Sequence, residues 1–180
     1  MLTIIIDSTE QYDEIKEEFI TFKARKLQLE HSLVSLSKWE SKWCKPFLSK
    51  TERTIEETID YIRCMTITQN IDPTVYNLLT KKNIDQVNKY IEAPMTATII
   101  SKHKNSPSNR EIVTAEIIYY WMIALNIPFE CQKWHLNRLI TLINVCNIKN
   151  APSKKMGKKA LMSRNTSLNA ARRKRFNTKG

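Results

Sequence analysis

Glycine is almost absent from this chain of 180 residues: the only two are Gly157 and Gly180. Loops that cradle phosphate need glycine, both for positive φ angles and for close approach of the backbone. The sequence therefore excludes Walker A loops, dinucleotide-binding fingerprints, kinase glycine-rich loops and the G-x-S-x-G nucleophile elbow from the long glycine-free part. Tight hairpin turns also favour glycine, so an all-β fold is disfavoured.

Positive charge is concentrated at the C-terminal end. Residues 151–180 hold ten of the 29 Lys and Arg and none of the 18 Asp and Glu, which gives this segment a charge of +10. The rest of the chain carries 19 minus 18, or +1. This division predicts a nearly neutral body with a cationic tail, and such a tail is typical of a contact with an acidic partner.

The first thirty residues have the pattern of a small hairpin. Residues 2–6 are rich in β-branched side chains, and residues 19–29 alternate so that Leu27 and Leu29 share one side. The polar stretch from Asp7 to Glu14 is expected to form the turn between these two strands. We expect this hairpin, residues 1–30, to pack on a helical body.

Residues 31–150 have helical periodicity and helix start signals. Thr54 and Glu57 form one expected capping box, and Ser108 and Glu111 form another. Asp72 followed by proline is a further start signal. The helices expected from these signals, from the apolar spacing and from proline stops cover about 30–45, 54–66, 73–79, 83–93, 112–127 and 129–147. The predicted fold is mainly α, with about five or six helices.

Two aromatic groups admit more than one interpretation. Residues 112–127 are apolar on most faces, so we expect a central helix with Tyr119, Tyr120 and Trp121 in the core. Trp39, Lys42 and Trp43 lie together on another expected helix. The tryptophans of that helix are expected to face the core; the alternative is a surface on which nucleic-acid bases stack.

No set of residues has the spacing of a convincing catalytic or metal site. Cys131 and His135 lie one helical turn apart on an expected helix, but zinc needs three or four ligands, and only Cys146 and His103 are plausible additions. A Cys–His nucleophilic pair lacks a visible orienting acid. The sequence therefore predicts no enzyme, no metal and no cofactor, and it predicts that Cys44, Cys64, Cys131 and Cys146 are buried free thiols.

The tail, residues 151–180, has too little apolar surface to pack alone and is expected to be disordered when free. Leu161, Leu168 and Ala171 or Arg172 would share one stripe if it folded as a helix on a partner. Nucleic acid, an acidic protein helix and an anionic membrane are all electrostatically suitable. The expected partner-binding residues are Lys154, Lys155, Lys158, Lys159, Arg164, Arg172, Arg173, Lys174 and Arg175.

Several whole segments resemble a family of small proteins of long-tailed bacteriophages, the tail assembly chaperones. The similar segments are Leu29–Trp43, Asp60–Met65, Ser108–Ile112, Tyr119–Arg138 and Asn147–Pro152, together with the basic end. The resemblance implies a mostly helical protein without enzymatic activity. It also implies binding to the long helical tape measure protein before the tail tube polymerises around it.

The expected function is therefore that of a tail assembly chaperone in the host cell cytoplasm, with the tape measure protein and also the tail tube protein as partners. The alternative is a nucleic-acid-binding or virion accessory protein that uses the basic tail. No membrane partner is expected, because no stretch approaches 18 uninterrupted apolar residues. Self-association into a homo-oligomer stays open.

Overall fold

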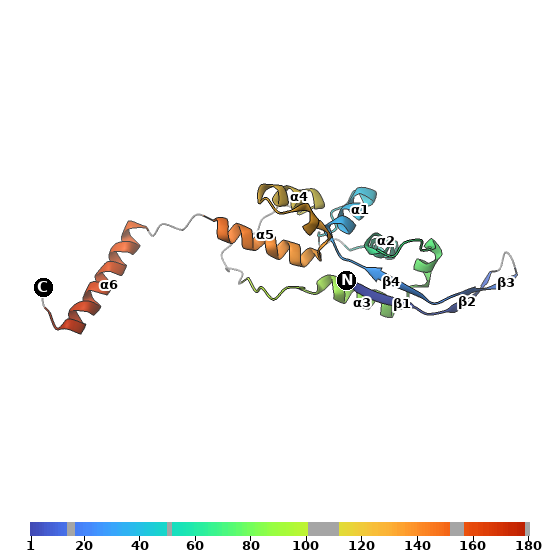
Figure 1. Cartoon of the computed structure of the whole chain (residues 1–180), viewed down its shortest axis with the longest axis horizontal. Helices are drawn as coiled ribbons and strands as arrows, with labels where there is room; N and C mark the ends of the chain where they lie inside the picture. Colours follow the sequence, from blue (N-terminus) through green and yellow to red (C-terminus); the bar gives the residue numbers. More distant parts are fainter. Residues whose placement is uncertain (14–16, 50–51, 101–111, 152–156, 179–180) are drawn as a thin grey trace. The chain divides into compact units, whose positions relative to one another are not determined.

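The fold is mainly helical, with a small antiparallel hairpin at the N-terminus, as the sequence predicts (Figure 1). The structure is a computed structural model that describes residues 1–13, 17–49, 52–100, 112–151 and 157–178. Two compact units make up the chain, Met1–Ile148 and Lys149–Gly180. The first unit holds the hairpin and most of the helical body, and the second holds the basic helix.

The hairpin consists of two consecutive antiparallel ladders. Strand β1 (Leu2–Ile6) pairs with β4 (Arg25–Leu29), and β2 (Thr9–Asp13) pairs with β3 (Glu18–Phe22). The first ladder buries one face on the body, with Ile4, Ile6, Leu27 and Leu29 in the core, which confirms that Leu27 and Leu29 share one side.

The second ladder corrects the expected turn over Asp7–Glu14. Residues Thr9–Asp13 are a strand because their backbone pairs with β3, and the rings of Tyr12 and Phe19 meet across the ladder at 5.1 Å. Both rings are largely exposed. Cross-strand aromatic pairs stabilise a ladder even where it buries no face in a core. The polar composition of this stretch therefore did not indicate the strand.

The body contains five α-helices and two short 3-10 helices in the described residues. They are α1 (Leu33–Trp43), α2 (Ile55–Met65), η1 (Pro73–Leu78), α3 (Lys81–Glu92), α4 (Ala115–Ala124), η2 (Phe129–Lys133) and α5 (Leu136–Asn150). The capping box at Thr54 is confirmed: the amide of Glu57 donates to Oγ1 of Thr54 at 3.2 Å, and the amide of Thr54 donates to the Glu57 carboxylate at 2.9 Å. Asp72 caps η1 as predicted.

Helix α3 begins earlier than expected because a different residue caps it. The predicted start was Asn83, but the N-cap is Thr80, and Asn83 is the third residue of the helix, where it completes a capping box. The Asn83 side chain also donates to the carbonyl of Ile5 at 3.1 Å. This bond holds α3 beside β1.

The body makes left-handed turns without glycine. Cys44, Asn70 and Asn126 have positive φ angles of 51°, 56° and 51°, and Cys44 ends helix α1 in this conformation. Asparagine tolerates the left-handed region better than most residues do. The body therefore makes sharp turns and helix ends without glycine.

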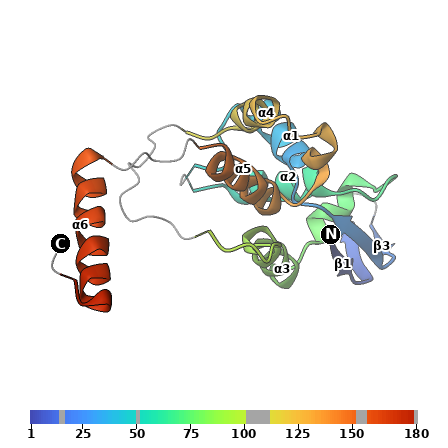
Figure 2. The same cartoon turned by 60° about the vertical axis from the view of Figure 1, so that its left-hand side comes forward.

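Helix α1 is the centre of the body and lies against α2, α4 and η2 (Figure 2). Its side chains Leu33, Leu36 and Trp39 are completely or almost completely buried. The indole Nε1 of Trp39 donates to the carbonyl of Glu57 at 2.9 Å, which ties α1 to α2. Trp39 is therefore a core residue, as its preferred interpretation predicted.

A buried carboxylate on α1 fixes the start of α4. The side chain of Glu40 accepts from the amide of Ala115 at 2.7 Å and from the amide of Phe47 at 2.8 Å. Thr114, the N-cap of α4, makes no side-chain capping bond, so Glu40 supplies the cap from a distant part of the chain. The helix consequently begins at Ala115 rather than at the expected Ile112.

The position of α4 corrects a second expectation. The expected capping box at Ser108–Glu111 lies outside the described residues. The predicted central helix over 112–127 is instead the shorter α4, and it packs on one side only. Tyr120 is 67% exposed, although the sequence placed it in the core, and Ile123 is 60% exposed. Tyr119 and Trp121 are half-buried.

Replacing Glu40 by alanine tests its capping role. Glu40→Ala leaves the buried amides of Ala115 and Phe47 without their acceptor, so the free energy of unfolding should fall by about 2–4 kcal/mol. Denaturant unfolding measures this loss, and amide hydrogen exchange should show faster exchange at both positions. Glu52→Ala is the control, since Glu52 is exposed, and should change stability by less than about 0.5 kcal/mol. Equal effects of the two variants would contradict the capping role.

Candidate functional site

Helix α4 presents an apolar face to solvent. Its buried side chains Ala115, Ile118 and Met122 face the core, and Tyr120 and Ile123 point away from it. Ala124 is exposed next to them. We call Tyr120, Ile123 and Ala124 the α4 face. Glu116 is the only charged residue among the ten of this helix, and it is exposed one turn before Tyr120 on the same side.

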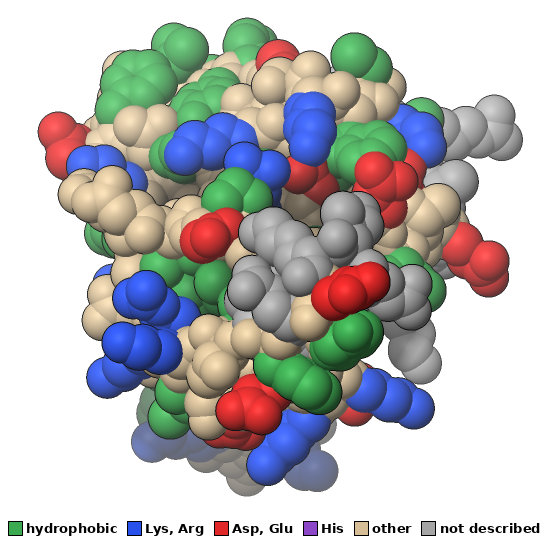
Figure 3. All heavy atoms as spheres, turned by 90° about the vertical axis from the view of Figure 1, so that its right-hand side faces the viewer, with side chains coloured by type: hydrophobic (Ala, Val, Ile, Leu, Met, Phe, Trp, Pro, Cys, Tyr) green, Lys and Arg blue, Asp and Glu red, His purple; other side chains and the backbone are tan. Residues whose placement is uncertain are grey.

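Exposed apolar side chains continue near this helix. Phe129, the first residue of η2, is 53% exposed, and the Tyr119 hydroxyl donates to the Gln132 side chain at 3.0 Å, which ties α4 to η2. Figure 3 shows hydrophobic side chains along the upper edge of the view, where Figures 1 and 2 place α4 and α1. Acidic and basic side chains are interspersed over the rest of that view.

Hydrophobic periodicity carries little signal for this face. Both sides of α4 are apolar, so periodicity cannot tell the side that packs on the body from the side that does not. The distinction comes from long-range contacts of α1 and from the Glu40 cap. A helix that is apolar all round normally lies in a core, and this is why Tyr120 was placed there.

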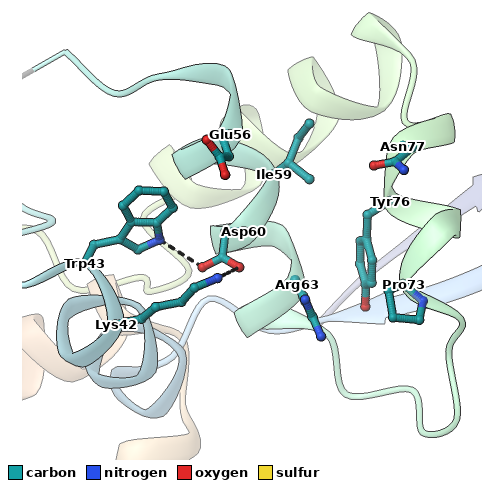
Figure 4. A pocket seen from close by; sticks show the side chains of 9 residues that line it. All are labelled: Lys42, Trp43, Glu56, Ile59, Asp60, Arg63, Pro73, Tyr76 and Asn77. Atoms are coloured by element: carbon teal, nitrogen blue, oxygen red, sulfur yellow. Dashed lines mark hydrogen bonds and ion pairs between the residues drawn. The ribbon is translucent and has the colours of Figure 1, made fainter.

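The suggested stacking site at Trp39, Lys42 and Trp43 does not present two free rings. Trp39 is 1% exposed, and Trp43 stacks on it with 6.2 Å between the ring centroids. Asp60 binds the other two residues: Lys42 Nζ lies 2.5 Å from one carboxylate oxygen, and Trp43 Nε1 donates to the other at 2.9 Å (Figure 4). The three residues lie close together, but Trp39 cannot stack on a base.

Asp60 also sets the charge of this region. Burial acts to raise the pKa of Asp60, but the hydrogen bonds from Lys42 and Trp43 outweigh it, and the pKa lies below its ordinary value. A negative carboxylate beside Trp43 repels phosphate. The neighbouring Glu57 is likewise held ionised, chiefly by a hydrogen bond from Lys45, which lowers its pKa.

Asp60, Lys42 and Trp43 line a small hollow between α1, α2 and η1 (Figure 4). Its volume is about 200 Å³, and Arg63 and Tyr76 line its other side. Ligand pockets usually have roughly 300–1,000 Å³. The hollow is thus small for a cofactor, and it has room for little more than a single side chain of a partner.

The basic end of the chain contains a long helix, α6 (Lys158–Phe176). It carries seven of the predicted partner-binding cations, and Lys154 and Lys155 lie outside the described residues. Every side chain of α6 that the structure describes is exposed. The expectation that the tail is disordered when free concerns the protein in solution and stays a prediction.

The expected apolar stripe on α6 is interrupted. Leu161 and Leu168 lie two turns apart on one side, as predicted, with 45% and 47% of their surfaces exposed. Arg164 and Arg172 occupy positions one turn away on the same side. The helix therefore has no continuous apolar face, and its cations surround it.

The suggested pair of Cys131 and His135 does not lie on one helix. Cys131 belongs to η2, whereas His135 precedes α5 and caps it by accepting from the amide of Asn137 at 3.3 Å. Burial, aided by Glu130, raises the pKa of the Cys131 thiol, which is unfavourable for a nucleophilic thiolate. His103 lies outside the described residues, and no group of three potential metal ligands occurs among the residues that are described.

His135 instead takes part in a buried cluster with His31. Their ring centroids lie 5.1 Å apart, edge to face. Nδ1 of His31 is hydrogen-bonded to the Tyr61 hydroxyl at 2.6 Å, and Nε2 of His135 to the carbonyl of Tyr90 at 3.0 Å. These bonds tie the segments that precede α1 and α5 to helices α2 and α3, so the cluster is structural.

Comparison of the chain with protein-family models, with curated proteins and with solved structures found no match. Within the part of the chain that is described, no helix is both long and apolar enough to cross a membrane. Among the described residues, the α4 face and α6 are two surfaces that are open to a partner.

The buried histidines predict a loss of stability in acid. Burial, with added repulsion from His135 and Arg53, lowers the pKa of His31 to about 3, against about 6.5 in the unfolded chain. The unfolded state thus binds a proton first, and stability that is complete above pH 6.5 is lost as the pH falls toward 3. We expect the free energy of unfolding to be about 2 kcal/mol lower at pH 5 than at pH 7 from His31 alone.

Denaturant unfolding of the parent and of His31→Gln at both pH values measures this effect. Glutamine cannot titrate, so the variant should show a smaller difference between pH 7 and pH 5. Part of the difference should remain, because burial also lowers the pKa of His135. An unchanged difference in the variant would contradict the assignment to His31.

Proposed function

We propose that the protein is a tail assembly chaperone of a long-tailed bacteriophage, which binds the tape measure protein without catalysing a reaction. The resemblance of whole segments to that family supports this function. The observation that carries it is the α4 face, where Tyr120 and Ile123 are exposed on a helix with one charged residue. Apolar side chains that cluster on a surface commonly mark a site for a protein partner.

The geometry of the α4 face suits a helical partner. Tyr120, Ile123 and Ala124 have the i, i+3, i+4 spacing that forms one side of a helix. A second helix packs against such a row by interdigitating its own side chains. The small side chain of Ala124 allows close approach, and Tyr120 and Ile123 supply the apolar surface.

The size of the face suits a reversible contact. Full burial of a side chain such as Ile123 contributes roughly 1.5–3 kcal/mol, and association itself costs several kcal/mol. A few such side chains therefore cover the apolar surface of a partner without binding it permanently. A chaperone has to leave the tape measure protein when the tube polymerises, so weak binding agrees with the proposed function.

The nearly neutral body leaves binding at this face to apolar contact rather than to charge. Its net charge of +1 gives little electrostatic attraction, so affinity for the tape measure protein should change little with salt. The predicted cations of the tail then supply a separate contribution. Electrostatic attraction would mainly raise the rate of encounter.

Light scattering of the tape measure protein, alone and with an excess of this protein, tests the function. The parent should suppress aggregation. Tyr120→Ser combined with Ile123→Ser should weaken binding by about 2 kcal/mol or more, which is about thirtyfold in Kd. Lack of suppression by the parent would contradict the proposed function.

Ile55→Ser combined with Ile99→Ser provides the matched control. Ile55 and Ile99 are 76% and 92% exposed and lie outside α4, so this variant loses two large exposed apolar side chains elsewhere on the surface. It should suppress aggregation as the parent does. Equal activity of the Tyr120/Ile123 variant and the control would show that the α4 face is not the binding site.

A further inference from the structure

Helix α6 differs from the α4 face in its charge and in how its side chains are distributed around the helix axis. Its seven cations are Lys158, Lys159, Arg164, Arg172, Arg173, Lys174 and Arg175. Residues 151–180 contain no Asp or Glu. The nineteen residues of α6 span about 28 Å at 1.5 Å per residue, and the cations lie at both ends of this length and within it.

The cations point to all sides of the helix. Arg172, Arg173, Lys174 and Arg175 are consecutive, and successive residues of a helix are about 100° apart. These four side chains alone therefore span about 300° around the axis. A groove on an acidic protein contacts one side of a helix and would leave most of them unpaired.

A membrane surface does not match this arrangement either. A helix that lies in a membrane interface needs an apolar face opposite its charges. On α6 the side of Leu161 and Leu168 also carries Arg164 and Arg172. Inserting the leucines would carry these guanidinium groups toward the hydrocarbon.

A partner that surrounds the helix with negative charge does match. The major groove of B-form DNA is about 12 Å wide and admits an α-helix, with phosphates along both walls. Continuous basic helices bind DNA in this way. We infer that α6 binds double-stranded DNA by lying in the major groove, with its cations on the phosphates of both strands.

The composition of α6 favours binding through phosphates over reading of sequence. Long cations can reach phosphates from both sides of the helix, and phosphate contacts carry affinity without sequence information. The small side chains Ser163, Ser167 and Ala170 between the cationic ends let the backbone approach the groove floor. This DNA-binding role uses residues of α6 and none of the α4 face, so loss of DNA binding would leave aggregation suppression by the α4 face intact.

Fluorescence anisotropy with a labelled 25-base-pair duplex, titrated with the full chain at several salt concentrations, tests the inference. The logarithm of the binding constant should fall with the logarithm of salt concentration, with a slope of about −6 if all seven cations of α6 contact phosphates. Replacing Arg172, Arg173, Lys174 and Arg175 by glutamine should reduce the slope to about −3. Absence of binding by the parent at low salt would overturn the inference.

A charge-matched variant distinguishes binding through the cations of α6 from an effect of the net charge of the protein. Lys26, Lys81, Lys82 and Lys89 are exposed on the body. Replacing them by glutamine removes four positive charges, as many as the α6 variant loses. This variant should keep the slope and affinity of the parent. If it weakens DNA binding as much as the α6 variant does, the contact is not specific to α6.

A proline substitution tests whether α6 binds DNA as a helix or only through its positive charge. Asn169→Pro keeps every charge but interrupts α6 in its middle, so affinity for the duplex should fall at least about tenfold. Unchanged affinity would overturn docking as a helix. Poly-glutamate and vesicles containing phosphatidylserine serve as competitors, and binding of either as tightly as DNA would overturn the choice of partner.

Discussion

The buried carboxylate of Glu40 is the interaction on which the arrangement of the body depends. It lies on the central helix α1 and accepts from the first amide of α4 and from the amide of Phe47. A buried carboxylate is costly unless its oxygens are hydrogen-bonded, and here both are. With its N-terminus held in this way, α4 turns Ile118 and Met122 inward and Tyr120 outward. The proposed binding face is thus a consequence of one long-range cap.

Local signals in the sequence were sufficient for much of the fold. The capping box of Thr54 and Glu57 satisfies neighbouring amides, so it can be recognised without any tertiary contact. The alternation that buries Leu27 and Leu29 is likewise local. The mistaken elements are those fixed from a distance. Glu40 shortens α4, and His135 separates η2 from α5 where one continuous helix was expected.

The functional surfaces were predictable to different degrees. The cations of α6 follow directly from composition, but their distribution around one helix required the helix boundaries. The α4 face was not predictable, because a residue such as Tyr120 becomes a surface residue only through what its neighbours pack against. The interpretation of Trp39 as a core residue is correct in spite of the neighbouring lysines in the sequence, because tertiary packing buries its ring.

Hydroxyl-radical footprinting with mass spectrometry, on the protein alone and with the tape measure protein, tests the central claim most directly. The method reports side-chain exposure residue by residue. Tyr120 and Ile123 should be reactive in the free protein and protected in the complex. Ile55 and Ile99, which are exposed elsewhere, should keep their reactivity. Undiminished reactivity of Tyr120 and Ile123 in a formed complex would contradict the account.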